Sequence, residues 1–243
     1  MRINLMITAL AALAASPARA DLRTFSRTYD YATQPQGNLE AELWNDVLPP
    51  YTSGGATVGQ RIVQRVELEY GVTDHLDVSL YHVFVWAPEA SGFDGWRLEG
   101  RYRLSDKGVW PVDVELYLEG ERPADLAEPF ELEEKLILGK DFGRLGFALN
   151  LVAEEKLAGG VRAGQRGELD AGARYEVLPW LRVGFEASYL VHSEQYDPGA
   201  ALYVGPGVSV AAGRLWLQLG VVTKVLGDAP GAVQLRSVLG FNL

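Results

Sequence analysis

The chain has 243 residues, a formal net charge of −10 and no cysteine. The acidic balance argues against nucleic acid as a partner, and the lack of cysteine excludes disulfides, thiolate metal ligands and a cysteine nucleophile. Because His75, His82 and His192 are too few and too scattered for a metal-binding motif, we expect neither a metal nor a cofactor.

Residues 1–20 have the composition of a cleavable secretory signal peptide. Arg2 gives a charged start, an apolar run covers residues 3–14, and Ala18-Arg19-Ala20 precedes Asp21. The apolar run is shorter than the roughly 20 residues that a membrane-spanning helix needs. We predict cleavage after Ala20. Cleavage removes two arginines and no acid, so the formal net charge moves from −10 to −12.

Residues 21–36 come before the first clear strand and contain Phe25, Tyr29, Tyr31 and Pro35. Their partial alternation of apolar and polar side chains favours an extended conformation. Three interpretations stay open for this segment. It is a periplasmic lead-in, an additional strand, or a segment folded into the interior of the following domain as a plug.

Residues 37–243 form one domain in which apolar and polar side chains alternate. In residues 96–104, for example, apolar side chains alternate with arginine and glutamate, which is the period of a strand with two unlike faces. Twelve such strands are predicted, at residues 38–44, 61–70, 76–86, 96–104, 112–118, 130–140, 145–153, 169–177, 181–191, 202–211, 215–223 and 233–243.

The connections between these strands are by turns short and long. Short turns are predicted at residues 72–74, 105–108, 141–144, 178–180 and 212–213, and longer polar loops at 46–60, 87–95, 122–129, 158–167, 193–199 and 227–231. This alternation is typical of an all-β, transmembrane antiparallel up-and-down β-barrel with short periplasmic turns and longer extracellular loops. Aromatic residues near the strand ends fit the interfacial girdles of such barrels.

The last strand, Leu235-Arg236-Ser237-Val238-Leu239-Gly240-Phe241-Asn242-Leu243, resembles that of Gram-negative outer-membrane proteins, although the terminal residue there is usually aromatic. Tyr70-Gly71-Val72-Thr73-Asp74-His75-Leu76, Leu151-Val152-Ala153-Glu154-Glu155 and Val204-Gly205-Pro206-Gly207 resemble outer-membrane barrels of the MetA-pathway-of-phenol-degradation type. The resemblance implies an outer-membrane location, recognition of the last strand by the barrel-assembly machinery, and passage of a small-molecule solute across the lipid bilayer.

If the more apolar face of each strand meets lipid, many charged side chains point into the lumen. The candidate lumen-lining residues are Arg97, Glu99, Arg101, Arg103, Asp113, Glu115, Glu133, Arg174 and Glu186. Opposite charges on paired strands can form ion pairs. These charges either form a polar constriction that selects a solute, or fill a narrow interior and balance one another.

Three classes of function follow from this pattern. The first is an outer-membrane barrel for passive or facilitated passage of a small solute, and the second is a structural or interaction barrel with a side-chain-filled lumen. The third is a lipid-modifying enzyme, for which the candidate residues are His192-Ser193-Glu194 at a strand end. Because neighbouring strand residues point to opposite faces, this trio lacks the geometry of a serine hydrolase, and we predict no enzyme activity.

Overall fold

A closed antiparallel barrel is the main feature of the computed structural model, which describes residues 23–53, 56–89, 91–159, 161–194, 197–227 and 231–243. The barrel strands are β1 (Leu39–Leu48), β4 (Arg61–Thr73), β5 (Leu76–Trp86), β6 (Ser91–Arg103), β7 (Asp113–Pro123), β8 (Phe130–Phe142), β9 (Leu145–Ala158), β10 (Val161–Leu178), β11 (Leu181–Glu194), β12 (Asp197–Ala212), β13 (Leu215–Gly227) and β14 (Val233–Asn242). The predicted fold, an antiparallel barrel of twelve strands, is confirmed.

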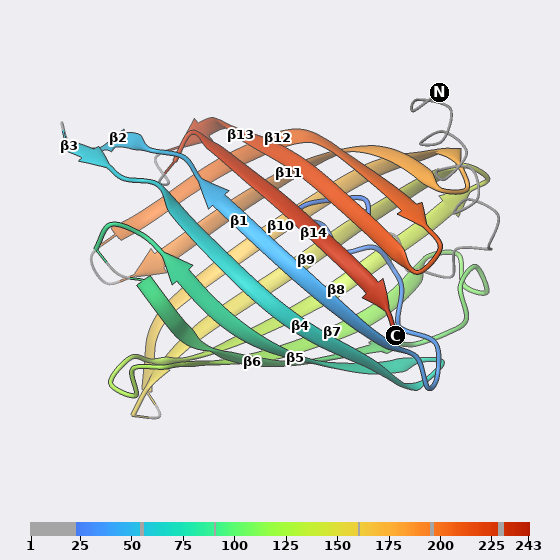
Figure 1. Cartoon of the computed structure of the whole chain (residues 1–243), viewed down its shortest axis with the longest axis horizontal. Helices are drawn as coiled ribbons and strands as arrows, with labels where there is room; N and C mark the ends of the chain where they lie inside the picture. The colour runs from blue at the N-terminus through green and yellow to red at the C-terminus, as the bar shows by residue number, and fades with distance from the viewer. Residues whose placement is uncertain (1–22, 54–55, 90, 160, 195–196, 228–230) are drawn as a thin grey trace, which may run out of the picture.

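Each barrel strand pairs with its neighbours in the sequence, and β1 pairs with β14 to close the ring. The start of β1 and the end of β14 therefore lie together at one end, which Figure 1 shows on the right. We call this the turn end, since the connections there include the two-residue links between β4 and β5 and between β8 and β9. The opposite end is the loop end, where β2 (Tyr51–Ser53) and β3 (Ala56–Val58) form a small hairpin.

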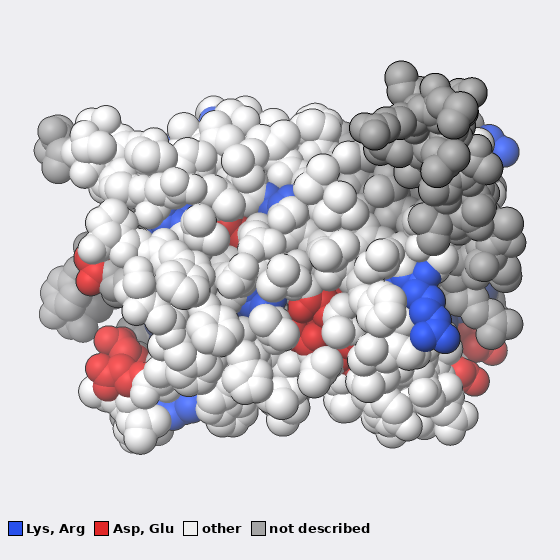
Figure 2. All heavy atoms as spheres, viewed as in Figure 1, with Lys and Arg blue, Asp and Glu red and all other residues white. Residues whose placement is uncertain are grey.

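The two faces of the wall differ as the alternation predicts. Along β5, Asp77, Ser79 and Tyr81 are at most 3% exposed, whereas Val78 and Leu80 are 38% and 41% exposed. The outer face is therefore apolar and the inner face polar, and most of the wall seen in Figure 2 carries no charge. In the described part of the chain no helix is long and apolar enough to cross a membrane.

Some of the predicted loops are shorter than expected at the loop end. Residues 158–167 and 193–199 were expected as loops, but β10 begins at Val161, β11 continues to Glu194 and β12 begins at Asp197. Here the strands extend beyond the apolar belt, so both of their faces meet polar surroundings. Apolar and polar side chains therefore do not alternate along these parts of the strands. At the turn end, by contrast, the connection between β6 and β7 spans residues 104–112.

An arginine on the outer face tests the orientation of the wall. Leu151 lies mid-way along β9 and is 46% exposed, so Leu151→Arg is expected to reduce the free energy of unfolding in lipid vesicles by about 2–4 kcal/mol. Leu226→Arg, near the loop end of β13, is the control and is expected to cost at most about 1 kcal/mol. Equal losses in urea unfolding would contradict the placement of Leu151 in the apolar belt.

Candidate functional site

The segment Arg23–Gln36 lies inside the barrel, in its turn-end half. Thr24, Phe25, Tyr31 and Gln34 are all at most 3% exposed, although no strand of the described chain pairs with them. Figure 1 shows this segment as a thin blue trace within the ring of strands. We refer to residues 23–36 as the N-terminal segment.

A single carboxylate holds the first part of the N-terminal segment. Glu186, on β11, accepts hydrogen bonds from the backbone amides of Ser26, Arg27 and Thr28 at 2.6, 2.8 and 3.0 Å. Its side chain is 1% exposed. Hydrogen bonds to an ionised acceptor are roughly twice as strong as those between neutral groups. Glu186 is therefore the strongest anchor of the segment.

Three further inward side chains bind the backbone in the same way. The amide of Tyr29 donates to Asn150 Oδ1 at 2.6 Å, and Asn150 Nδ2 donates back to the carbonyl of Tyr29 at 3.0 Å. Glu115 accepts from the amide of Ala32, and Asp77 from that of Gln34, both at 2.9 Å. The four acceptors come from β11, β9, β7 and β5 in turn, so the segment crosses the interior in contact with every second strand.

Charged side chains of the segment are also paired with the wall. Arg27 donates to Glu168 at 2.8 Å and to Gln234 at 2.7 Å, and Asp30 lies 3.1 Å from Arg174. Burial alone would lower the pKa of Arg27, but the carboxylates of Glu168 and Asp170 raise it above its ordinary value. Arg27 therefore remains a cation inside the barrel.

Two glycines on the wall make room for the only phenylalanine of the N-terminal segment. A Cβ at Gly172 would lie 2.6 Å from Phe25 Cζ, and one at Gly184 2.9 Å from Phe25 Cε1. Gly172→Val is therefore expected to displace Phe25, lower stability by about 1–3 kcal/mol and raise ion conductance. The control is Gly167→Val on the same strand, because its Cβ would meet no atom closer than 4.0 Å. A rise in both variants would contradict this account.

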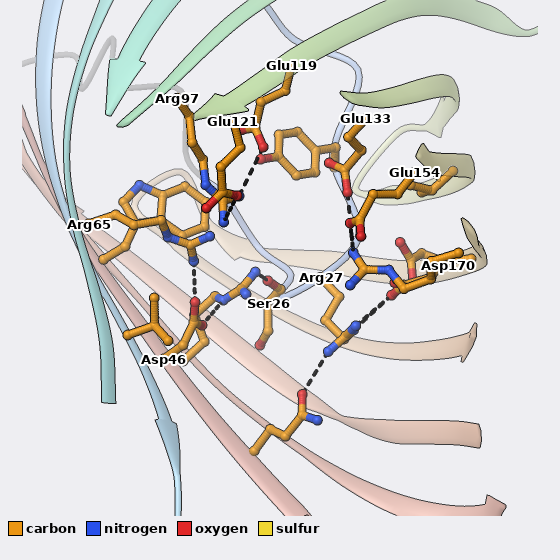
Figure 3. A pocket seen from close by; sticks show the side chains of 18 of the residues that line it. Ser26, Arg27, Asp46, Arg65, Arg97, Glu119, Glu121, Glu133, Glu154 and Asp170 are labelled. Atoms are coloured by element: carbon orange, nitrogen blue, oxygen red, sulfur yellow. Dashed lines mark hydrogen bonds and ion pairs between the residues drawn. The ribbon is translucent and has the colours of Figure 1, made fainter. Parts of the chain in front are cut away.

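A cavity of about 510 Å³ lies above the N-terminal segment, in the loop-end half of the barrel. Ser26, Arg27 and Tyr29 of the segment form part of its lining, so the segment is its floor. Figure 3 shows charged side chains pointing into it from several strands. The cavity and the segment together make up the candidate site.

The charged side chains around the cavity form ion pairs with neighbours on the adjacent strand or on the same strand. Arg97 lies 2.9 Å from Glu119 and 2.6 Å from Glu121. Lys135 pairs with Glu133 at 2.8 Å. These contacts place charged groups at the surface of a cavity whose lining also includes apolar side chains such as Trp44 and Val152.

The structure brings four of the nine predicted lumen residues against the N-terminal segment. Glu115 and Glu186 bind backbone amides, Arg103 donates to Thr33 Oγ1 at 2.7 Å, and Arg174 pairs with Asp30. The other five contact the wall or a turn. Their contacts are Arg97 with Glu119, Glu99 with Tyr81, Arg101 with Asp77, Asp113 with the amide of Gly108, and Glu133 with Lys135.

Several important residues were not among the predicted ones. Asp77, Asn150 and Glu168 bind the N-terminal segment, and the alternation of their strands places them on the inner face. The strand pattern could therefore have given their orientation, but not their partners. The side chains of His192, Ser193 and Glu194, the candidate enzyme trio, lie outside the described residues, as does the predicted signal peptide, residues 1–20.

One group of carboxylates lies close enough together to hold a cation. Oxygens of Glu40, Glu42 and Glu69 are all within 4.8 Å of one another. Glu40 accepts a hydrogen bond from Trp216 Nε1 at 2.7 Å, and Glu69 pairs with Arg101. Two of the three carboxylates thus already have protein donors, and we assign no metal role to the group.

No protein-family model matches the chain, and no curated protein matches it. Among solved structures, an outer membrane channel from Pseudomonas putida F1 has a TM-score of 0.66 at 12% identity, covering 90% of this chain and 100% of that one. The KdgM porin has a TM-score of 0.58 at 12% identity, covering 84% of this chain and 99% of that one. The NanC porin has a TM-score of 0.57 at 11% identity, covering 84% of this chain and 100% of that one.

At these identities the likeness concerns the fold. The chain has the fold of the outer-membrane barrels that are known as channels and porins. The narrower resemblance to the MetA-pathway type stays a prediction, since no family model matches.

Proposed function

We propose that this chain is an outer-membrane channel for a small polar solute and that the N-terminal segment is its plug. The observation that carries the proposal is the way the segment is held. Its backbone amides bind inward carboxylates such as Glu186 and Glu115, below a polar cavity of about 510 Å³. Because these amides bind side chains and the segment pairs with no strand of the described chain, the plug can leave without breaking the strand pairing of the wall.

The fold and the composition of residues 1–20 support the outer membrane as the location. The apolar outer face suits the bilayer, and residues 1–20 would direct export before cleavage. The turn end would then face the periplasm and the loop end the exterior. The last strand, β14, presents Leu239 and Phe241 on its outer face, 43% and 38% exposed, as the signal for the barrel-assembly machinery.

A structural barrel with a filled lumen is the competing function. Buried ion pairs such as that of Arg101 with Asp77 do fill part of the turn-end half. The cavity at the loop end, however, is polar and large enough for a small molecule, and this favours passage.

A reversible lock on the plug tests the proposal. A Cβ at Gly220 would lie 3.0 Å from Ser26 Cβ, which is shorter than the roughly 3.5–4.5 Å of a disulfide, so the segment must move away by about half an ångström for the bridge to form. Because the chain has no cysteine, the double variant Ser26→Cys/Gly220→Cys can form only this bridge within one molecule. We expect the oxidised protein in planar bilayers to pass little current and the reduced protein to conduct.

The matched control is Ser26→Cys alone, which is expected to respond to neither oxidant nor reductant. Solute passage would be followed in parallel by liposome swelling with small sugars and amino acids. Equal conductance and equal swelling in the oxidised and reduced double variant would show that the plug need not move. The absence of any conductance in either state, from demonstrably inserted protein, would favour the filled structural barrel.

A further inference from the structure

The cavity above the plug has one wall with a surplus of positive charge. Arg61 and Arg65 of β4 and Arg236 of β14 point into it, around the single carboxylate of Asp46 on β1. Asp46 forms ion pairs with both Arg65 and Arg236. Arg61 lines the cavity and is exposed, and within the described chain no ion pair to it is found. This basic wall therefore carries three cations and one anion.

Another wall of the same cavity has a surplus of negative charge. Its side chains come from β7, β8 and β9, and Lys135 lies among them. The carboxylates of this acidic wall are Glu119, Glu121, Glu131, Glu133 and Glu154. Arg97 and Arg166, on the flanking strands, form ion pairs with some of them. These five carboxylates still outnumber the three cations that line this side of the cavity, and Lys156, outside the lining, lies 3.4 Å from Glu131.

The strand order places β8 and β9 of the acidic wall opposite β14 and β1 of the basic wall, whereas β7 lies only three strands from β4. In the closed ring β9 is six strands away from β1, and β8 is six strands away from β14, so each lies half-way round from its counterpart. Figure 3 shows Arg65 and Asp46 on one side of the cavity and Glu133 and Glu154 on the other. An electric field therefore crosses the cavity from the basic to the acidic wall. A concave site with low-dielectric walls concentrates such a field.

The cavity lining also contains uncharged side chains. Tyr81 of β5, Tyr117 of β7 and Val152 of β9 border the cavity, and each is at most 8% exposed. Aromatic and aliphatic side chains in the lining suit the uncharged middle of a solute. A solute with one charge is attracted to one wall and repelled by the other. A solute with opposite charges at its two ends is attracted to both walls.

We propose that the cavity is a binding site for small zwitterions. The ammonium end of the solute lies at the acidic wall near Glu131 on β8 and Glu154 on β9, and the carboxylate or sulfonate end lies at the basic wall near Arg61. This inference deepens the proposed function, because it names the chemical class of the solute that the channel admits. It rests on the lining of the cavity and does not require that the plug moves.

Binding of matched probes tests the proposal. 6-Aminohexanoate, hexanoate and hexylammonium share a six-carbon chain and differ in charge. Titration calorimetry on the protein in a non-ionic detergent is expected to give 6-aminohexanoate about tenfold higher affinity than either singly charged probe, as one additional charged hydrogen bond would produce. Amino acids with shorter and longer chains, from glycine to 8-aminooctanoate, would then measure the span between the walls.

Two single variants separate the contributions of the walls. Arg61→Gln is expected to weaken 6-aminohexanoate and hexanoate about fivefold or more and to leave hexylammonium unchanged or tighter. Glu131→Gln is expected to do the reverse, weakening 6-aminohexanoate and hexylammonium. Arg144→Gln, in the turn between β8 and β9 at the other end of the barrel, removes the same charge as Arg61→Gln and should change none of the three affinities.

The proposal would be overturned if the three probes bound equally, if none bound, or if Arg61→Gln and Arg144→Gln behaved alike. These outcomes are distinct from a failure of the channel function. A barrel that conducts and swells liposomes but does not prefer 6-aminohexanoate is a channel without this selectivity. A barrel that binds 6-aminohexanoate but passes neither ions nor solutes has the binding site but is not a channel.

Discussion

Removing the N-terminal segment is expected to raise the single-channel conductance of the barrel several-fold. Residues 23–36 fill the turn-end half of the lumen and provide Ser26, Arg27 and Tyr29 as the floor of the cavity. Their deletion, with residues 1–22 kept for export, would join the cavity to the turn end by a continuous path. The measurement is current through single molecules in planar bilayers, compared with the full-length chain.

A single substitution tests the same prediction in case the protein without residues 23–36 does not fold. Glu186→Gln removes the charge that three backbone amides share and is expected to give an intermediate conductance with frequent transitions between levels. Glu176→Gln is the matched control. Glu176 lies near the turn end, and its carboxylate is 3.7 Å from Arg182 in a long, partly exposed ion pair that does not involve the segment. If the deleted barrel is folded and conducts like the full-length chain, the segment is not the plug.

Arg101→Met is expected to destabilise the barrel by about 3–5 kcal/mol, because breaking a buried ion pair leaves a charge without a partner. Arg101 is 4% exposed and contacts three carboxylates, Glu69, Asp77 and Glu99, which are themselves at most 4% exposed. Methionine has a similar length but no charge. Urea unfolding of the protein in lipid vesicles, followed by tryptophan fluorescence, would measure the loss.

The control for this prediction changes the same residue types at an exposed position. Arg144→Met lies in a turn, where only a 3.5 Å hydrogen bond to the carbonyl of Val177 is lost, and is expected to cost less than about 0.5 kcal/mol. Adding Glu69→Gln to Arg101→Met should restore part of the stability, since fewer buried charges then lack a partner. A stability of Arg101→Met equal to that of the unmodified chain would show that the buried carboxylates do not need Arg101.

The barrel itself could be predicted from the sequence because its main constraint is local. A wall with lipid on one side and a polar interior on the other forces every second side chain to be apolar, so that Leu116 and Tyr117 fall on opposite faces. The structure gives Leu116 46% exposure and Tyr117 4%. Where both faces are polar, as at Gln165 and Arg166 near the loop end, this constraint disappears, and the sequence pattern predicts a loop where the structure has a strand.

The position of the N-terminal segment could not be predicted in the same way. Its partners lie far along the chain, since Gln34 binds Asp77 and Ser26 binds Glu186, 43 and 160 residues away. Nothing in the local pattern of residues 21–36 distinguishes a segment held by distant carboxylates from a free lead-in. The predicted lumen residues share this limit, because alternation gives the direction of Arg174 or Glu115 but not the group that each one meets.

The order of elements along the chain has a consequence for assembly. The ring closes when β14, the last strand, pairs with β1, and the N-terminal segment is joined directly to β1. The acceptors of its backbone amides lie on β5, β7, β9 and β11, all of which precede β14 in the chain. The segment can therefore bind these strands before β14 pairs with β1 and closes the ring. The partly formed sheet would then already curve around the segment. In this view the segment serves first as an internal template that sets the curvature of the sheet.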